Sequence, residues 1–191
     1  DPQDIGRSYE AIIRINSQSG KGGVAYVLDR EHGFDLPKSM HPIVGKYIYD
    51  LADQHGRELT VDEIRDAFFE HFVNVESHLS VMEYELIHQP GGGQVHCNAT
   101  ISQAGKSQRI EGDGNGPINS FVHALEIGGL KDFKVTDYRS HAVQGGSDAS
   151  AAAYVQLQHE DGRLLWGTGV DSSIEMAGLK ALVTGWNLLR G

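Results

Sequence analysis

The stretch EGDGNGPINSFVHAL, residues 111–125, joins the end of a predicted strand to the start of a predicted helix. Its apolar residues recur at the spacing of one helix face, namely Ile118, Phe121, Val122 and Leu125. Pro117 suits the first helical position, and Asn115 or Gly116 suits the cap before it. The glycines permit a tight turn and let another group come close to the backbone.

A helix start of this composition leaves backbone N–H groups without acceptors at the positive end of the helix dipole. Such a start favours a bound anion, for example a phosphate or a carboxylate. The alternative is a turn between a strand and a helix that binds nothing. The stretch alone leaves both interpretations open.

The same order of elements occurs twice in the C-terminal part of the chain. The first copy predicts three strands and a helix, over residues 80–89, 94–103 and 107–114 and from Pro117. The second copy predicts strands over 134–144, 150–160 and 164–169 and a helix over about 172–189. The motif Gly112-Asp-Gly aligns with Gly167-Thr-Gly about 55 residues later, which indicates an internal repeat.

The repeat predicts an α+β fold of two βββα units related by pseudo-twofold symmetry. One three-stranded sheet with one helix does not easily bury its own apolar face, so the two units are expected to pack together. This symmetry places the glycine-rich helix starts, residues 114–117 and 169–172, in equivalent positions. They are expected to face each other across one cleft.

The N-terminal region predicts a strand or helix edge over residues 8–16, a glycine turn over 17–23 and a strand over 24–28, with the sequence VAYVL. The turn lacks the GxxxxGK[ST] spacing of a phosphate-binding loop. We also expect no helix after Gly23, so the turn is interpreted as a connection between strands.

Residues 36–72 predict two helices of a small helical region. The first ends at His55-Gly56, and its apolar stripe consists of Ile43, Val44, Tyr47, Ile48 and Leu51. The second follows Thr60, which is expected to form a capping box with Glu63. Its apolar residues are Ile64, Ala67, Phe68 and Phe72.

The strand sequence DASAAAYV, residues 148–155, is unusual because alanine is a poor strand former. Alternation places Ala149, Ala151 and Ala153 on one face. Their small methyl groups leave room for a neighbouring helix or for a small apolar ligand, and the preceding strand from Tyr138 to Ala142 borders the same space. An apolar face of this kind, together with an anion-binding helix start, suits a small branched amino acid.

Composition argues against several classes of function. The net charge of −10 and the pI near 5.4 argue against a nucleic-acid-binding surface. No run approaches the roughly 18 apolar residues of a membrane helix, and the polar start, without a signal peptide, reads like the interior of a longer protein. Cys97 is the only cysteine, which fits a reducing cytoplasm. We expect neither a metal site nor a self-contained active site, because no ligand spacing, nucleophile set or carboxylate pair is evident.

Four motifs carry a family resemblance that covers essentially the whole chain. They are GRSYEAIIRINSQSGKGGVAYVL at 6–28, HGFDLP at 32–37, GDGNGPINSFVHAL at 112–125 and DYRSHAVQGGSDASAAAYV at 137–155. In order and sequence they resemble the C-terminal part of the 2-isopropylmalate synthases, which catalyse the first committed step of leucine biosynthesis.

The resemblance implies a parent acyltransferase whose catalytic barrel condenses acetyl-CoA with 3-methyl-2-oxobutanoate by means of a divalent metal. That barrel is not in this chain, which is therefore expected to hold no cofactor and to be inactive alone. The resemblance further implies a linker segment over 1–33, a small helical subdomain over 34–76 and a leucine-binding dimerisation domain over 77–191. Tyr9 matches a linker tyrosine that lies near the partner subunit's active site in that family and would assist catalysis there.

The resemblance also implies a leucine site for feedback inhibition, in a cytoplasmic homodimer. Its residues would be Gly114, Asn115, Gly116, Pro117, Ile118, Val135, Tyr138, Ala142, Ala149 and Ala151. No role is carried over to Asn119 or Asp171. Two alternatives stay open: the regulatory domain of a citramalate synthase that binds isoleucine, and a module that only dimerises.

Overall fold

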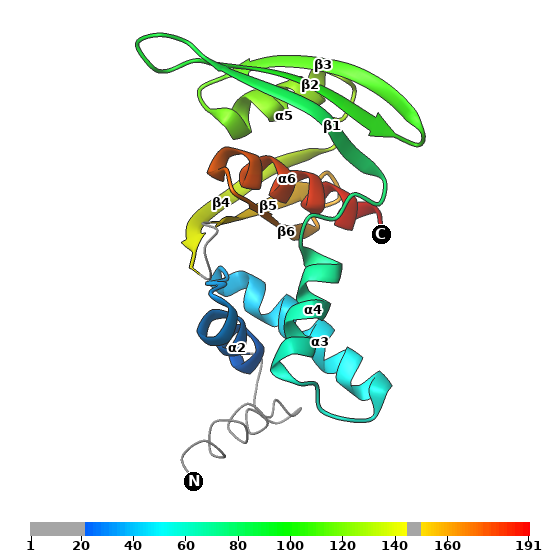
Figure 1. Ribbon diagram of the computed structural model, residues 1–191. Coiled ribbons are helices and arrows are strands. Elements are labelled where there is room, and N and C mark those ends of the chain that lie inside the picture. Colours follow the sequence, from blue (N-terminus) through cyan, green and yellow to red (C-terminus); the bar gives the residue numbers. More distant parts are fainter. Residues whose placement is uncertain (1–21, 145–149) are drawn as a thin grey trace. The chain divides into compact units, whose positions relative to one another are not determined.

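The computed structural model describes residues 22–144 and 150–191 of the chain (Figure 1). These residues form two compact units. Unit 1 contains residues 22–71 with 143–144, and unit 2 contains residues 72–142 with 150–191. Tyr9, Ala149 and the elements expected before residue 22 lie outside the described residues. The division into parts at 1–33, 34–76 and 77–191 stays a prediction.

Unit 1 is helical and consists of α2 Gly22–His32, the short 3-10 helix η1 Lys38–Met40, α3 His41–His55 and α4 Val61–Phe72. The two helices predicted over 36–72 are confirmed. α3 ends where Gly56 adopts the left-handed conformation, with φ 65°. At the start of α4, the Thr60 N–H donates to Glu63 at 2.8 Å and the Glu63 N–H donates to the Thr60 hydroxyl at 3.2 Å. The predicted capping box is therefore present, and hydrogen bonds from Arg57 and Thr60 lower the pKa of Glu63 to about 2.

The strand predicted for the VAYVL sequence is wrong, because these residues form the first turns of α2. Val24, Val27 and Leu28 are buried at helical spacing, whereas Tyr26 is 59% exposed. Strict alternation would have placed Tyr26 on the same face as two of these buried neighbours. The expectation that no helix follows the glycines is also wrong, since α2 begins at Gly22.

Unit 2 contains two three-stranded antiparallel sheets, each followed by a helix, which confirms the predicted pair of βββα units. The first copy consists of β1 Leu79–His88, β2 Val95–Gln103, β3 Lys106–Gly114 and α5 Pro117–Ile127. The second copy consists of β4 Phe133–Val143, β5 Ser150–His159, β6 Leu164–Asp171 and α6 Ile174–Arg190. The strand orders are β1-β2-β3 and β4-β5-β6. Residues 90–93 close the first hairpin as expected, with the Gln89 N–H donating to the Gln94 carbonyl at 3.0 Å.

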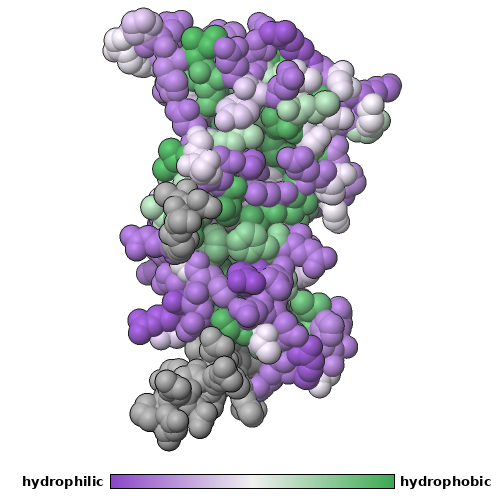
Figure 2. Space-filling model, in the orientation of Figure 1, coloured by the Kyte–Doolittle hydropathy of each residue, from purple (hydrophilic) through white to green (hydrophobic). Residues whose placement is uncertain are grey.

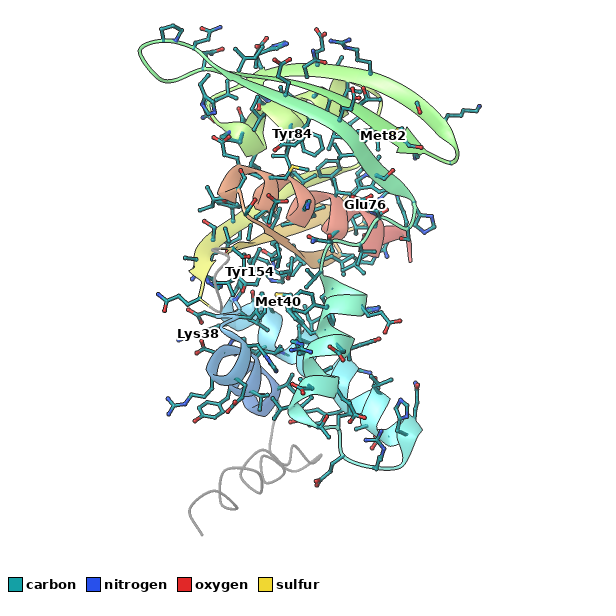
Figure 3. All side chains as sticks on the ribbon, viewed as in Figure 1. Lys38, Met40, Glu76, Met82, Tyr84 and Tyr154 are labelled. Carbon is teal, nitrogen blue, oxygen red and sulfur yellow. The ribbon has the colours of Figure 1, made fainter. Side chains whose placement is uncertain are left out.

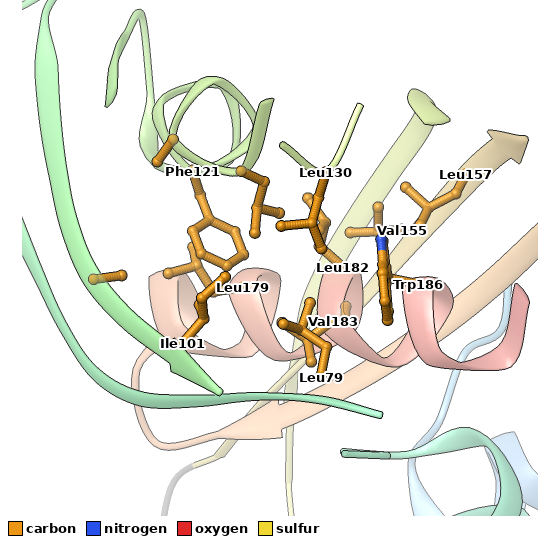
Figure 4. Close-up of a cluster of buried hydrophobic side chains, with 14 of the residues drawn as sticks. Leu79, Ile101, Phe121, Leu130, Val155, Leu157, Leu179, Leu182, Val183 and Trp186 are labelled. Carbon is orange, nitrogen blue, oxygen red and sulfur yellow. The ribbon is translucent and has the colours of Figure 1, made fainter. Parts of the chain in front are cut away.

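In unit 2 the helices α5 and α6 lie between the two sheets (Figure 1). Their inward sides and the facing strands form one core, in which Phe121 of α5 and Leu182 and Trp186 of α6 meet Ile101 of β2 and Leu157 of β5 (Figure 4). All five side chains are at most 2% exposed. Because each copy covers apolar surface of the other, the hydrophobic effect stabilises the pair as one unit.

Each of these helices lies very close to the strand that precedes it. A Cβ atom added at Gly112 would lie 2.3 Å from a backbone atom of α5, and one added at Gly167 would lie 2.1 Å from a backbone atom of α6. Gly114 and Gly169 show the same close approach. Since non-bonded atoms do not pack at such distances, the Gly-X-Gly motifs mark the helix-to-strand contact of each copy. Gly112 and Gly169 occupy equivalent places, because each meets the helix backbone 8 and 12 residues further along the chain.

The alanines of β5 pack against α6. Ala151 and Ala153 are at most 7% exposed and belong to the core cluster that contains Ala177 and Ala181 of α6. At these two positions the small methyl groups therefore accommodate a neighbouring helix, which was one of the two interpretations left open by the sequence.

Residues 73–79, here called the connecting segment, join α4 to β1 and are fixed by a buried side chain of α6. The Asn187 carbonyl oxygen accepts the N–H groups of His78 and Leu79 at 2.9 and 2.8 Å. Its amide nitrogen donates to the carbonyls of Val75 and Leu79 at 2.7 and 2.9 Å. Asn187 is 1% exposed, so these bonds satisfy its amide and four backbone groups that would otherwise lack partners.

Some apolar side chains of unit 2 are exposed. Met82 and Tyr84 extend from β1, at the edge of its sheet, and are 61% and 40% exposed (Figure 3). Figure 2 shows hydrophobic areas among hydrophilic ones on the visible face, an ordinary mixture for a folded protein. Across the part of the chain that the structure describes, no helix combines the length and apolar character needed to cross a membrane.

Replacing Asn187 by alanine should strongly destabilise unit 2. The Asn187→Ala variant leaves the buried N–H and carbonyl of Leu79 and the part-buried groups of Val75 and His78 without this partner, so we expect its free energy of unfolding to fall by about 3 kcal/mol or more. Its melting temperature should fall by about 6–12 °C, measured by circular dichroism. The control is Asn98→Ala, because Asn98 accepts only a bond from the exposed side chain of Arg109 among the bonds described here. A similar loss of stability in both variants would contradict the stabilising role of Asn187.

Candidate functional site

A pocket of about 610 Å³ opens beside the first turn of α5 in unit 2. Its lining comes from the start and one side of α5, the first half of β4 and the first turn of α6. The lining residues are Asn115, Gly116, Pro117, Ile118, Asn119, Val122, His123, Glu126, Lys134, Val135, Tyr138, Ile174 and Glu175. Its volume lies in the ordinary range of small-molecule sites.

The start of α5 borders this pocket, and within the described residues no side chain caps it. Gly116 is the N-cap, in extended conformation with φ −174°. By helix geometry, the amides of Ile118 and Asn119 have no acceptor within α5, and Pro117 has no amide hydrogen. A Cβ atom added at Gly116 would meet nothing within 4 Å, so the space beside the cap is open. Such a start is suited to binding an anion.

The start of α6 is occupied by the chain's own side chains. Ser173 is the N-cap, and its hydroxyl accepts the Met176 N–H at 3.4 Å. The Asp171 carboxylate accepts the Ser173 N–H at 2.9 Å and a bond from Lys180 at 2.7 Å. Burial raises the pKa of Asp171, but the hydrogen bonds from Lys180 and Ser173 outweigh it and lower the pKa overall. An ionised carboxylate therefore stands at this helix start at neutral pH.

The internal repeat makes the two helix starts directly comparable. Counted from the two N-caps, Asp171 lies two residues before Ser173, just as Gly114 lies two residues before Gly116. The second copy thus places a hydroxyl and a carboxylate of its own at its helix start, where the first copy has Gly116 and Gly114, and the space beside Gly116 is open. A carboxylate bound beside Gly116 would give the first copy what the second already contains.

One wall of the pocket is apolar. It contains Ile118 and Val122 of α5 and Val135 and Tyr138 of β4. At Gly178 of α6, an added Cβ atom would lie 2.9 Å from the Cδ1 atom of Ile118 and 3.5 Å from the Tyr138 ring. The glycine therefore lets α6 pack directly against two residues of the pocket wall.

Charged groups complete the lining. Lys134, Glu126 and Glu175 contribute both signs of charge. Glu175 lies in the first turn of α6 and pairs with His88 at the end of β1, with 2.9 Å between the imidazole Nε2 and the carboxylate. The pocket thus combines an anion-binding helix start, an apolar wall and a carboxylate that attracts a cation. These are the three groups that a small apolar amino acid requires.

The structure brings together six of the ten residues predicted for leucine binding, Asn115, Gly116, Pro117, Ile118, Val135 and Tyr138. Gly114, Ala142 and Ala151 do not line the pocket. Gly114 lies under α5, and Ala151 lies in the core beside α6. Ala149 lies outside the described residues. The role of the set in binding stays a prediction.

Sequence reasoning missed several lining residues. Val122 lies on the predicted apolar face of α5, so helical spacing from Ile118 was a usable signal. Ile174 and Glu175 come from the second helix start, which symmetry placed at the same cleft, although the expected range of 169–172 ended too early. Lys134 carries no local signal, because its place depends on how β4 packs beside α5.

Fold and pocket together define an α+β domain built from an internal repeat, with one concave site between the two helix starts. The chain belongs to the family described as the LeuA allosteric (dimerisation) domain, whose family model matches residues 58–190. Residues 1–29 match a second family, the alpha-isopropylmalate synthase post-catalytic domain-like family.

Curated relatives named 2-isopropylmalate synthase are similar to nearly the whole chain. The protein of Agrobacterium fabrum is 42% identical over 191 residues, and that of Mycobacterium ulcerans is 41% identical over 191 residues. The protein of Thermobifida fusca is 42% identical over 187 residues. Each match covers 98% of this chain but only 34%, 33% and 32% of the respective relative. The chain therefore spans about a third of the length of these enzymes.

Alanine at Gly114 should destabilise the fold more than alanine at Gly116. The new Cβ atom at 114 would lie 2.4 Å from the Ser120 nitrogen, whereas at 116 it enters open space. We expect Gly114→Ala to lower the free energy of unfolding by about 1–3 kcal/mol. Gly116→Ala should lower it by less than about 1 kcal/mol, the difference between glycine and alanine at an N-cap. Urea denaturation of both variants measures this, and equal losses would refute the distinction.

Proposed function

We propose that the chain is the C-terminal regulatory part of a 2-isopropylmalate synthase and that it binds leucine as a feedback inhibitor. The observation that carries the proposal is the pocket, because it joins an uncapped helix start to an apolar wall. Membership of an allosteric dimerisation family and the names of the relatives support a regulatory role in that enzyme.

Leucine matches the distribution of groups in the pocket. Its carboxylate would accept the amides at the start of α5, beside Gly116, where the helix dipole favours negative charge. Its side chain would lie against Ile118, Val122, Val135 and Tyr138. Burial of a leucine side chain contributes about 1.5–3 kcal/mol to binding, so the apolar wall supplies a substantial share of the affinity.

The ammonium group of leucine would be held by Glu175 rather than by Glu126. Ammonium and carboxylate are attached to one carbon of the ligand, so both partners must lie near the helix start. Glu126 is nine residues beyond Pro117, about 13 Å along α5. Glu175 belongs to the first turn of α6, and α6 packs against Ile118 one turn later, at Gly178.

The parent enzyme is part of the same proposal. Its catalytic barrel would condense acetyl-CoA with 3-methyl-2-oxobutanoate, using a divalent metal held by the barrel. We infer a cytoplasmic homodimer, in which Tyr9 of this chain assists catalysis in the partner's active site. The family's description as a dimerisation domain supports the homodimer. Leucine would inhibit by binding one conformational state of the dimer more tightly than another.

Leucine binding is tested by calorimetric titration of this chain with leucine, isoleucine, valine and norleucine. We expect saturable binding with leucine preferred over isoleucine by about tenfold, since one displaced methyl group in an apolar pocket is worth about 1–3 kcal/mol. Preference for isoleucine would instead identify the regulatory domain of a citramalate synthase. Absence of binding by all four amino acids would leave a module that only dimerises.

A carboxylate built into the first helix start should exclude leucine. The Gly116→Asp variant places a carboxylate at the N-cap of α5, and the added atoms enter open space. We expect an unchanged or slightly higher melting temperature, because Asp caps a helix at least as well as Gly. Leucine affinity should fall at least about tenfold, because the new carboxylate would occupy the amides of the helix start and repel the carboxylate of leucine. The control is Ser107→Asp, which adds the same charge on β3, outside the pocket, and should keep the wild-type affinity for leucine. Unchanged leucine affinity in Gly116→Asp would refute the proposed position of the leucine carboxylate.

A further inference from the structure

The connecting segment, residues 73–79, extends the edge of the second sheet. Val73 forms a parallel bridge with Thr168 of β6, and the Asn74 N–H donates to the Thr168 carbonyl at 3.0 Å. The Asn74 side chain accepts the Val170 N–H at 3.0 Å and donates to the Val170 carbonyl at 3.1 Å. The segment is therefore attached to the same strand that carries the start of α6.

Two polar residues inside α6 bind the next residues of the segment. Thr184 accepts the Val75 N–H at 2.9 Å and donates to the Lys180 carbonyl at 2.8 Å. Asn187 makes the four bonds to Val75, His78 and Leu79 described above. Thr184 and Asn187 are at most 1% exposed, and burying such groups is unfavourable unless they are hydrogen-bonded. Much of their hydrogen-bonding capacity is used by the connecting segment.

The other end of α6 borders the pocket. Ile174 and Glu175 line it, and Gly178 packs against Ile118 of the pocket wall. Thr184 follows Ile174 by ten residues, about 15 Å along the helix. A single continuous helix thus contacts the pocket at its first turns and the connecting segment further along.

We propose that α6 transmits occupation of the pocket to the connecting segment through Thr184 and Asn187. This inference rests on the proposed function for its ligand, leucine. A ligand held by Glu175 fixes the first turn of α6, and α6 in turn fixes the segment that it binds by hydrogen bonds. The segment directly follows Phe72, the last residue of α4, so the coupling reaches the point where the chain leaves unit 1.

The test is hydrogen–deuterium exchange of this chain with and without saturating leucine, read by NMR at the amides of Val75, His78 and Leu79. We expect leucine to slow their exchange by about fivefold or more, as expected for allosteric coupling. The informative variant is Thr184→Val, which keeps the shape of the side chain and removes the acceptor for Val75. It should bind leucine within about threefold of the wild-type affinity, because it lies outside the pocket, and the slowing at Val75 should be lost.

Thr184→Ser is the matched control, since it keeps the hydroxyl and should keep the slowing at Val75. A second control is the exchange rate of the amides over 107–110 in β3. None of the hydrogen bonds described above joins these residues to α6 or to the connecting segment. Slowing of equal size there would indicate general stabilisation by the ligand and would overturn the proposal. Full slowing at Val75 in Thr184→Val, or leucine binding without slowing in the wild type, would also overturn it. The last result would leave the proposed function intact, whereas absence of leucine binding in the titration would refute both.

Discussion

The close approach of each helix to the glycines of its preceding strand is the constraint on which unit 2 depends. Gly112 and Gly114 lie under α5, and Gly167 and Gly169 lie under α6, with no room for a Cβ atom at any of the four. This close contact sets the distance between each helix and its sheet, so that the two sheets can pack on either side of one layer of helices. It also fixes where each helix begins relative to its strand, and the pocket lies at those beginnings.

The two copies share this scaffold but differ where the helices start. Ser173 and Asp171 satisfy the start of α6 from within the chain. The first copy has Gly116 and Gly114 at the corresponding positions, and no side chain of its N-cap satisfies its helix start. Two copies of a repeat can share the same packing motif and still differ at the helix start. In one copy a side chain places negative charge at the positive end of the helix dipole, and in the other a bound ligand can do so. This difference between the two copies therefore supports anion binding at the start of α5 more strongly than the glycine-rich turn does alone.

The parts of the fold that sequence predicted are those encoded by local pattern. Strand alternation, hairpin turns and the Gly-X-Gly repeat led to both βββα units, and Thr60 with Glu63 marked the start of α4. The VAYVL segment was assigned wrongly because a run of five mostly apolar residues after glycines fits a strand or a helix equally well. Only the exposure of Tyr26 in the structure distinguishes the helix from the strand. In the site, the residues near the α5 start were found from their own sequence. Lys134 and Glu175 were not, since tertiary packing brings them to the pocket.

The way α6 is packed limits how it can respond to a ligand. Gly167 and Gly169 seat it on β6, and at Gly185 an added Cβ atom would lie 3.1 Å from Leu157. Dense packing of this kind resists displacement perpendicular to the sheet. A response to leucine would then be a small shift along the helix axis or a loss of motion at its first turn, and either would reach Asn187 through the continuous backbone hydrogen bonds of the helix. Because Asn187 holds two N–H groups and two carbonyls of the connecting segment, even a small change at α6 alters several bonds there at once.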